Sequence, residues 1–168
     1  YCFNFFHKLI YKIMSYTRLF FPENLSINFK SKLDRSQSHY LAKVMRMKSG
    51  EVFSLFNNNG EWLAEIIQIS KGIVEFSINE KLRQKENSKE IWLAFSPLKS
   101  NYFNFMIQKA TELGVTKFIP IIFHRTIVRK INNKRLEKII IEATEQSNRI
   151  NVPILKEVQN LKNFLSKN

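Results

Sequence analysis

Cysteine, glycine, proline and long apolar runs are all scarce in this sequence of 168 residues. It has one cysteine, four glycines and four prolines. A single cysteine can form neither an intrachain disulfide nor a cysteine-based metal cluster, which favours a reducing compartment, and we predict a cytoplasmic location. No uninterrupted apolar run approaches the roughly 18 residues that span a bilayer. With 44% hydrophobic residues, the composition predicts a packed protein.

Histidine is scarce as well. His7, His39 and His124 lie far apart and lack the short helical spacing of common zinc motifs. We therefore predict no metal site.

Acidic residues are few relative to basic ones. The chain has 27 Lys and Arg against 14 Asp and Glu, a formal charge of +13. Residues 1–50 carry nine basic and two acidic side chains, residues 51–100 six and seven, and residues 101–168 twelve and five. Two basic regions around a neutral middle indicate a polyanion, with nucleic acid as the first partner. A merely solvated basic surface is the plain alternative.

The first residues read as an addition to the folded body. Residues 1–14 are rich in Phe, Tyr, Leu and Ile with interspersed lysines, and we treat them as an N-terminal extension. A degenerate signal or a peripheral membrane segment is the rival interpretation.

Residues 15–80 alternate β-rich runs with turn signals, which predicts a small β-barrel or sheet. Strands are expected at 17–21, 51–56, 62–69 and 73–78, with a turn at Lys71-Gly72. Near-helical spacing of apolar residues predicts one helix over 38–47.

A polar linker at 81–90 precedes a change of period at residues 91–168. Strands are expected at 91–95, 117–123 and 154–158, and helices at 102–113 and from Asn133 to a stop at Pro153. The first helix would bury Phe103, Met106, Ile107, Ala110 and Leu113. Strands that alternate with helices predict an α/β domain with a parallel sheet. Three strands are few for such a domain, so we expect an incomplete one.

Several polar residues of this second domain have site-like positions. Arg125 follows the second strand, at the carboxyl edge where α/β sheets bind ligands. Gln108 and Glu112 lie one helical turn apart, and Arg149 lies within reach of Glu145 or Glu142. Spacing alone leaves open whether these groups bind RNA or form a solvated helix face. In the first domain, Arg18, Lys43, Arg46 and Lys48 lie among aromatic residues, a mixture that suits RNA, and His39 is a further candidate.

Five segments carry a resemblance to a known family. They are SHYLAKVMRM at 38–47 with Gly50-Glu51, PLK at 97–99, QKATELGV at 108–115, Arg125-Thr126, and EQSNR at 145–149 with Val152-Pro153. In order and spacing they resemble the RsmE family, the 16S ribosomal RNA (uracil-N3)-methyltransferases, over roughly residues 15–160.

The resemblance implies a fold, a reaction and partners. These are an N-terminal PUA-like RNA-binding barrel, a SPOUT-type α/β methyltransferase domain with a trefoil knot, S-adenosylmethionine as the methyl donor, and a homodimer acting on the small ribosomal subunit. Two departures stand out: His124 replaces an acidic residue usual in the family, and the Gly-rich knot segments are absent. We therefore expect a C-terminally truncated chain with no cofactor-binding residue, for which a non-catalytic RNA-binding fragment is the alternative.

The chemistry of that reaction leads to a hypothesis about individual residues. We predict that Arg125 and Arg149 orient the uracil and its phosphate and that Glu112 or Glu145 holds them. The residues expected to contact RNA are Arg18, His39, Lys43, Arg46, Lys99, Gln108 and Gln146.

Overall fold

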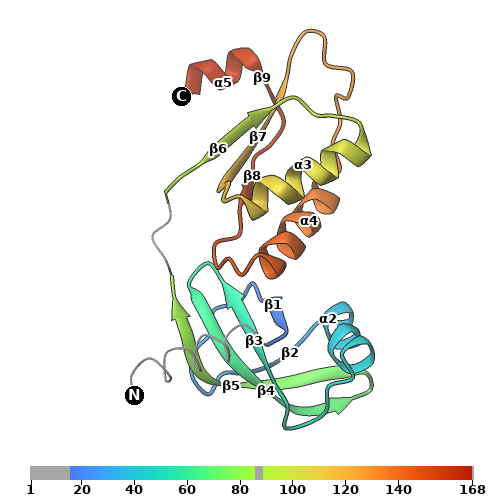
Figure 1. Cartoon of the computed structure of the whole chain (residues 1–168), viewed down its shortest axis with the longest axis vertical. Helices are drawn as coiled ribbons and strands as arrows, with labels where there is room; N and C mark the ends of the chain where they lie inside the picture. The colour runs from blue at the N-terminus through green and yellow to red at the C-terminus, as the bar shows by residue number, and fades with distance from the viewer. Residues whose placement is uncertain (1–15, 86–88, 168) are drawn as a thin grey trace. The chain divides into compact units, whose positions relative to one another are not determined.

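The computed structural model of the chain describes residues 16–85 and 89–167, and the chain divides into two compact units, Tyr1–Glu86 and Asn87–Asn168 (Figure 1). Each unit has its own hydrophobic core. The predicted extension at 1–14 lies outside the described residues.

A curved five-stranded sheet forms the first unit, in the order β1-β3-β4-β5-β2. β1 runs parallel to β3, and the other pairs are antiparallel. The two-residue turn at Lys71-Gly72 joins β4 to β5 as predicted, and both residues have the positive φ, 49° and 77°, that tight hairpins need. The elements are β1 (Arg18–Phe20), β2 (Lys30–Lys32), α2 (Arg35–His39), a π-helix η1 (Tyr40–Val44), β3 (Val52–Asn57), β4 (Gly60–Ser70) and β5 (Ile73–Gln84).

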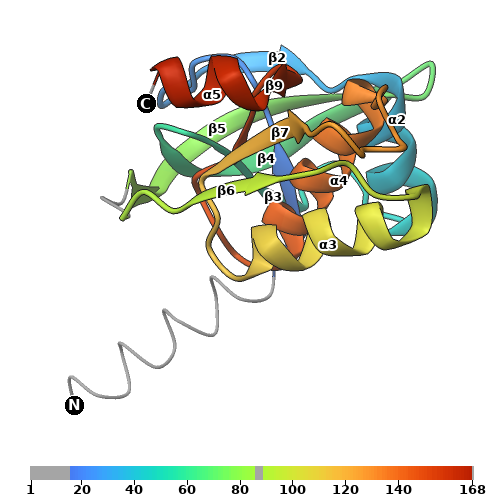
Figure 2. The ribbon, with the colours of Figure 1, turned by 90° about the horizontal axis from the view of Figure 1, so that it is seen from above.

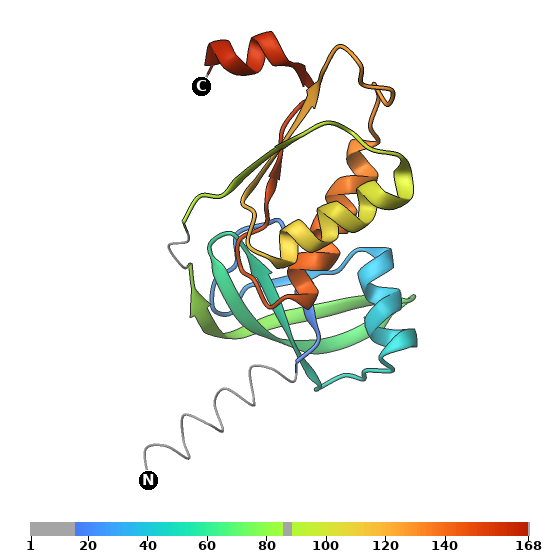
Figure 3. The same cartoon turned by 45° about the horizontal axis from the view of Figure 1, so that its top comes forward.

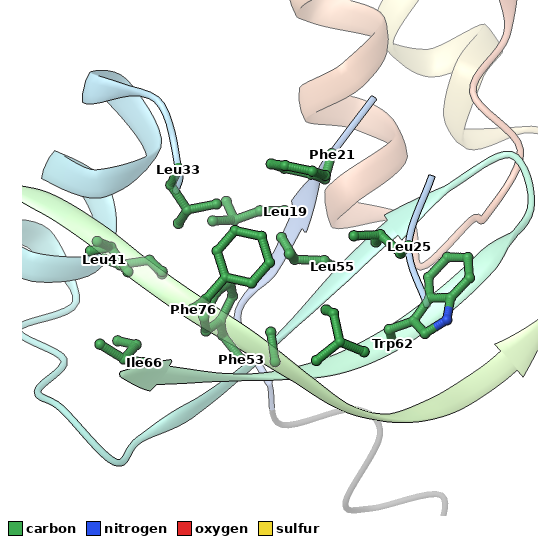
Figure 4. Packing of buried hydrophobic residues seen from close by; sticks show 13 residues of the cluster. Leu19, Phe21, Leu25, Leu33, Leu41, Phe53, Leu55, Trp62, Ile66 and Phe76 are labelled. Atoms are coloured by element: carbon green, nitrogen blue, oxygen red, sulfur yellow. The ribbon is translucent and has the colours of Figure 1, made fainter. Parts of the chain in front are cut away.

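Alternate residues of the central strands build the core of this unit. Phe76 is fully buried and lies edge-on to Phe21 and Phe53, with ring centroids 5.3 and 6.1 Å apart (Figure 4). Leu41 anchors η1 in the same core. The hydrophobic alternation of the sequence therefore predicted the sheet, whereas the short β2 was missed because its Lys-Ser-Lys sequence has no apolar residue.

β5 continues into the segment that we predicted to be a linker. Its last residues pair with β4, and their cations have partners there. The Lys81 ammonium lies 5.2 Å from the Trp62 ring centroid, and Arg83 Nη1 lies 3.3 Å from Glu61 Oε2. These partners keep polar residues in the strand, so the linker predicted at 81–90 begins later than expected.

The second unit is built around β7, which pairs in parallel with all its neighbours. α3 and α4 lie side by side on one side of the strands (Figure 3), and α5 lies on the other side of β7 from α3 (Figure 2). The elements are β6 (Trp92–Phe95), α3 (Ser100–Glu112), β7 (Lys117–Ile122), α4 (Asn133–Gln146), β8 (Ile154–Leu155), β9 (Gln159–Asn160) and α5 (Leu161–Lys167).

Two differences from the predicted α/β pattern have local causes. The strand expected at 154–158 is shorter: β8 ends at Leu155 and pairs with the start of β7, and a separate strand, β9, pairs with the end of β7. Pro120 lies between the two pairings and has no N–H to donate to a ladder. Leu113 is 82% exposed, because α3 ends at Glu112 and the chain turns through Gly114 at a φ of 105°. The prediction that Leu113 is buried was wrong.

A buried ion pair stabilises the outer side of the first unit. The Glu61 side chain is 0% exposed; its Oε1 lies 2.8 Å from Arg18 Nε and accepts from Ser54 Oγ, also at 2.8 Å. The Arg18 guanidinium also lies 4.5 Å from the Phe56 ring centroid. Removing Arg18 would leave the buried Glu61 carboxylate with the longer contact to Arg83, at 3.3 Å, as its remaining ion pair.

We therefore expect Arg18→Met to lower the free energy of unfolding by about 3 kcal/mol in a denaturant titration. The matched control is Lys32→Met, which removes an exposed lysine paired with Glu75 at 2.8 Å and should cost no more than about 1 kcal/mol. Equal effects of the two substitutions would contradict the structural role of Arg18.

Candidate functional site

A rigid turn holds Arg125 at the carboxyl end of β7. The Phe123 N–H donates to Thr126 Oγ1 at 2.8 Å, and the Thr126 N–H donates to the Phe123 carbonyl at 3.1 Å. The same hydroxyl of Thr126 shares a 2.9 Å hydrogen bond with Ser96 Oγ, in the loop after β6. Two neighbouring loops are thereby tied together, and Arg125 lies exposed between their fixed points.

The surroundings of Arg125 are strongly basic. Residues 113–136 contain six Lys and Arg and no Asp or Glu. Arg125, Arg129 and Lys130 are exposed, and Arg129 Nη2 donates to the His124 carbonyl at 3.3 Å. Phe123 and Ile127 are exposed beside them. Cations next to apolar side chains suit phosphates and unpaired bases.

The other predicted catalytic residues of this unit lie at the opposite edge of the sheet. A helix that connects parallel strands returns the chain from the carboxyl edge to the amino edge. Glu112, Glu145 and Arg149 all lie in or just after the last turns of α3 and α4, and therefore at the amino edge. Within one copy of this unit, the structure does not bring them together with Arg125.

Arg149 binds the end of α3. Its Nη1 donates to the carbonyl oxygens of Thr111 and, at 2.9 Å, Val115, and its Nη2 lies 3.4 Å from the Gly114 carbonyl. Burial lowers the pKa of Arg149 from its ordinary value. The last carbonyls of a helix lack intrahelical partners and attract cations. Arg149 thus clamps α4 to α3, a role that helical spacing did not reveal because its partners are backbone atoms more than 30 residues away.

Gln108 and Glu112 interact as predicted. Gln108 Nε2 donates to Glu112 Oε1 at 2.9 Å, and Lys109 Nζ donates to Oε2 at 2.8 Å. Hydrogen bonding from Lys109, and next from Gln108, lowers the pKa of the Glu112 carboxyl. The ionised Glu112 carboxylate is therefore bound by two side chains of its own helix, Gln108 and Lys109. This argues against the prediction that Glu112 holds Arg125 or Arg149. Glu142 lies 3.7 Å from Lys138 Nζ.

The residues predicted to contact RNA divide into buried and exposed ones. The Arg18 side chain is 8% exposed and bound to Glu61, which argues against direct contact with RNA. His39, Lys43 and Arg46 are exposed together on α2, η1 and the following turn. Lys99 is exposed at the N-terminus of α3, and Gln146 is exposed at the end of α4.

No metal cluster is evident in the described ranges 16–85 and 89–167: they contain no group of three or more His, Cys, Asp or Glu placed to hold an ion.

If Arg149 is a structural clamp, Arg149→Met should destabilise the second unit by about 1 to 3 kcal/mol, because it leaves helix-end carbonyls without their donor. Thermal unfolding of the chain measures this. Arg125→Met removes the same charge from an exposed position and serves as the control, with an expected change within about 0.5 kcal/mol. An Arg149→Met variant as stable as the unsubstituted chain would contradict the structural role of Arg149.

Both units match described families. Residues 33–79 match the RNA methyltransferase PUA domain, and residues 85–168 match the RNA methyltransferase domain. The chain is 35% identical over 157 residues to ribosomal RNA small subunit methyltransferase E of Rickettsia conorii, covering 92% of this chain and 64% of the relative. It is 33% identical to the protein of the same name from Buchnera aphidicola, covering 90% of this chain and 63% of that relative.

Solved structures agree with these matches. Ribosomal RNA small subunit methyltransferase E from Neisseria gonorrhoeae, bound to S-adenosylmethionine, superposes with a TM-score of 0.77 at 29% identity. A Legionella pneumophila protein solved with the same cofactor gives 0.81 at 28% identity. In each case 91% of this chain covers 66% of the solved chain. The chain thus spans about two thirds of the length of these relatives, and the resemblance seen in its motifs is confirmed: it belongs to the RsmE family of RNA methyltransferases.

Proposed function

We propose that the protein methylates N3 of a uridine in the 16S RNA of the small ribosomal subunit, with S-adenosylmethionine as the methyl donor. Family membership supports the reaction, and relatives solved with this donor support the cofactor. The observation that carries the proposal for this chain is the acid-free carboxyl edge of β7, with Arg125 held by the Thr126 turn. Such an edge suits a polyanionic substrate.

The chemistry explains why a guanidinium is needed there. N3 of uracil is a poor nucleophile until its proton leaves, and the resulting anion spreads its charge over the flanking carbonyl oxygens. A fixed cation that donates to such an oxygen favours the deprotonated form. The turn fixes the backbone of Arg125, and its exposed side chain can reach a base bound at this edge. Arg129 and Lys130 are placed to bind the neighbouring phosphates.

The donor itself is a poor match to this edge. S-adenosylmethionine supplies an electrophilic methyl group on a positively charged sulfur. Residues 123–135 contain five Lys and Arg and no Asp or Glu, so their charge would repel the sulfonium. We therefore derive no step through the donor, and the absence of cofactor-binding residues in this chain stays a prediction.

The amino edge calls for a different role. Arg149 is committed to the end of α3, so we propose that it positions helices rather than substrate. Glu145 and Gln146 lie beside it on α4, and their predicted roles stay proposals. The division into a barrel, a linker and a methyltransferase part is likewise proposed.

A homodimer is the proposed assembly, and α3 offers a surface for it. Tyr102, Phe105 and Leu113 are spaced along one side of the helix and are 74%, 62% and 82% exposed. Apolar side chains in such a stripe are typical of protein contacts. We also propose a cytoplasmic location, where the ribosomal substrate resides. Within the described ranges, no helix is both long and apolar enough to span a bilayer.

We expect Ala at the position of Arg125 in a full-length family member to lower kcat for N3-methyluridine formation by about 10² to 10³-fold with the fold intact. Mass spectrometry of digested RNA measures the product. Lys134→Ala, which removes an exposed cation from the start of α4, is the control and should change mainly the RNA affinity. Unchanged turnover with Arg125→Ala would sink the assignment, and RNA binding without any methylation would favour the non-catalytic alternative.

If the α3 stripe forms the dimer contact, Leu113→Glu in this chain should weaken dimerisation at least about tenfold, because it buries an unpaired charge. Sedimentation velocity across protein concentrations measures this. Ile69→Glu, an exposed apolar residue of the first unit, should leave the dimer unchanged. A dimer unaffected by Leu113→Glu would exclude this stripe.

A further inference from the structure

The α2–η1 surface of the first unit, formed by the exposed residues of 35–48, combines charge with exposed apolar side chains. Residues 35–50 contain four Lys and Arg and no Asp or Glu. In the described part of the chain none of these four cations has a carboxylate partner. Among these cations lie Tyr40, Val44 and Met45, whose exposed fractions are 40%, 59% and 45%.

The two flanking carboxylates form no ion pair with these cations and accept backbone N–H groups instead, and four cations outnumber them. Asp34 Oδ1 accepts from the Gln37 N–H at 2.8 Å, and Glu51 Oε2 accepts from the Lys48 N–H at 2.9 Å. Both hold the ends of the α2–η1 segment in place. The positive charge is thus left for an outside partner.

A rigid base supports the surface. Leu41 is fully buried and points into the core beside Ile66 and Phe76 (Figure 4). The Ser38 hydroxyl donates to the Leu33 carbonyl at 3.3 Å and accepts from the Val74 N–H at 3.0 Å, and Gln37 Nε2 donates to the Phe20 carbonyl at 2.7 Å. The backbone on such a base loses little further entropy on binding.

The backbone of this segment is also unusual. Tyr40–Val44 forms a π-helix, closed by the Met45 N–H donating to the Tyr40 carbonyl at 2.9 Å. Arg46 follows with a φ of 56°, which is costly for a residue with a side chain. Single π-turns and strained residues concentrate at functional sites. Here they place Arg46 directly after the exposed apolar residues.

We propose that the α2–η1 surface binds an unpaired segment of RNA, with a base stacked on Tyr40 and backbone phosphates on Lys43 and Arg46. The proposal rests on the RNA-directed function above and adds the form of RNA that this unit recognises. A paired helix presents phosphates and sugars and hides the faces of its bases, so it would satisfy the cations but leave the apolar side chains without partners. Unpaired bases satisfy both, because every base has a face that stacks on an aromatic ring.

The test compares two RNAs on the whole chain by fluorescence anisotropy at several salt concentrations. One is a labelled single strand, and the other is a labelled hairpin stem of the same length. We expect tighter binding of the single strand. Tyr40→Ala should weaken that binding roughly tenfold or more while Tyr40→Phe retains it, since the ring rather than the hydroxyl stacks.

The cations have a separate readout. The double substitution Lys43→Gln with Arg46→Gln should reduce the slope of log K against log salt by about 1.4, at roughly 0.7 per phosphate contact on a single strand. Lys32→Gln removes one charge from outside the surface and is the control, with an unchanged slope. Ile27→Ala is the matching control for an exposed apolar residue.

The outcomes separate this inference from the proposed function. Equal binding of strand and stem, or a silent Tyr40→Ala, overturns the inference while leaving methylation untouched. Binding to vesicles of anionic lipid without binding to either RNA overturns the inference too, and identifies the surface as a membrane contact. If the full-length protein binds the single strand but forms no N3-methyluridine, only the proposed reaction is overturned.

Discussion

Parallel pairing in the sheet of the second unit decides which functional side chains can meet. The connections from β6 to β7 and from β7 to β8 each contain a helix that carries the chain back to the amino edge. Arg125 follows β7 at the carboxyl edge, whereas Glu112 and Arg149 come at the ends of α3 and α4. The hydroxyl of Thr126 joins two loops at the first edge, and Arg149 joins two helix ends at the second. The carboxyl edge therefore has the exposed Arg125, whereas the amino edge is stabilised by Arg149, which is bound to backbone carbonyls.

The same distinction between free and committed charge runs through the first unit. Arg18 and Arg83 are bound to the buried Glu61, so they stabilise the sheet. The cations of 35–48 form no ion pair with a carboxylate in the described part of the chain, and they surround exposed apolar side chains. A net charge of +13 therefore says little until the partner of each cation is known. The proposed binding of RNA rests on the cations that form no ion pair with a carboxylate of the chain.

Regular alternation made much of the fold predictable. The strands β3 and β4, the helix α3 and the starts of β5 and α4 were expected close to their actual positions, because the period of apolar residues differs between strand and helix. β5 ends later than expected, at Gln84, and α4 ends earlier, at Gln146. β2 and β9 were not expected, since their short polar sequences have no such period, and α5 was not expected although Leu161, Phe164 and Leu165 have helical spacing. The prediction that Leu113 is buried was wrong because periodicity does not show where a helix stops. α3 ends before Leu113, which leaves exposed a side chain that a longer helix would have buried.

By itself, the sequence determined the class of each unit, the family and the candidate residue types, because these depend on local periodicity and on the identity of short segments. Only the tertiary structure decided what each candidate does. The buried Glu61 commits Arg18 to the sheet, the carbonyls at the end of α3 commit Arg149 to a clamp, and a turn fixed through Thr126 leaves Arg125 exposed. The physical reason is that these roles depend on partners far away in sequence, and burial and hydrogen bonding arise only when the chain has folded.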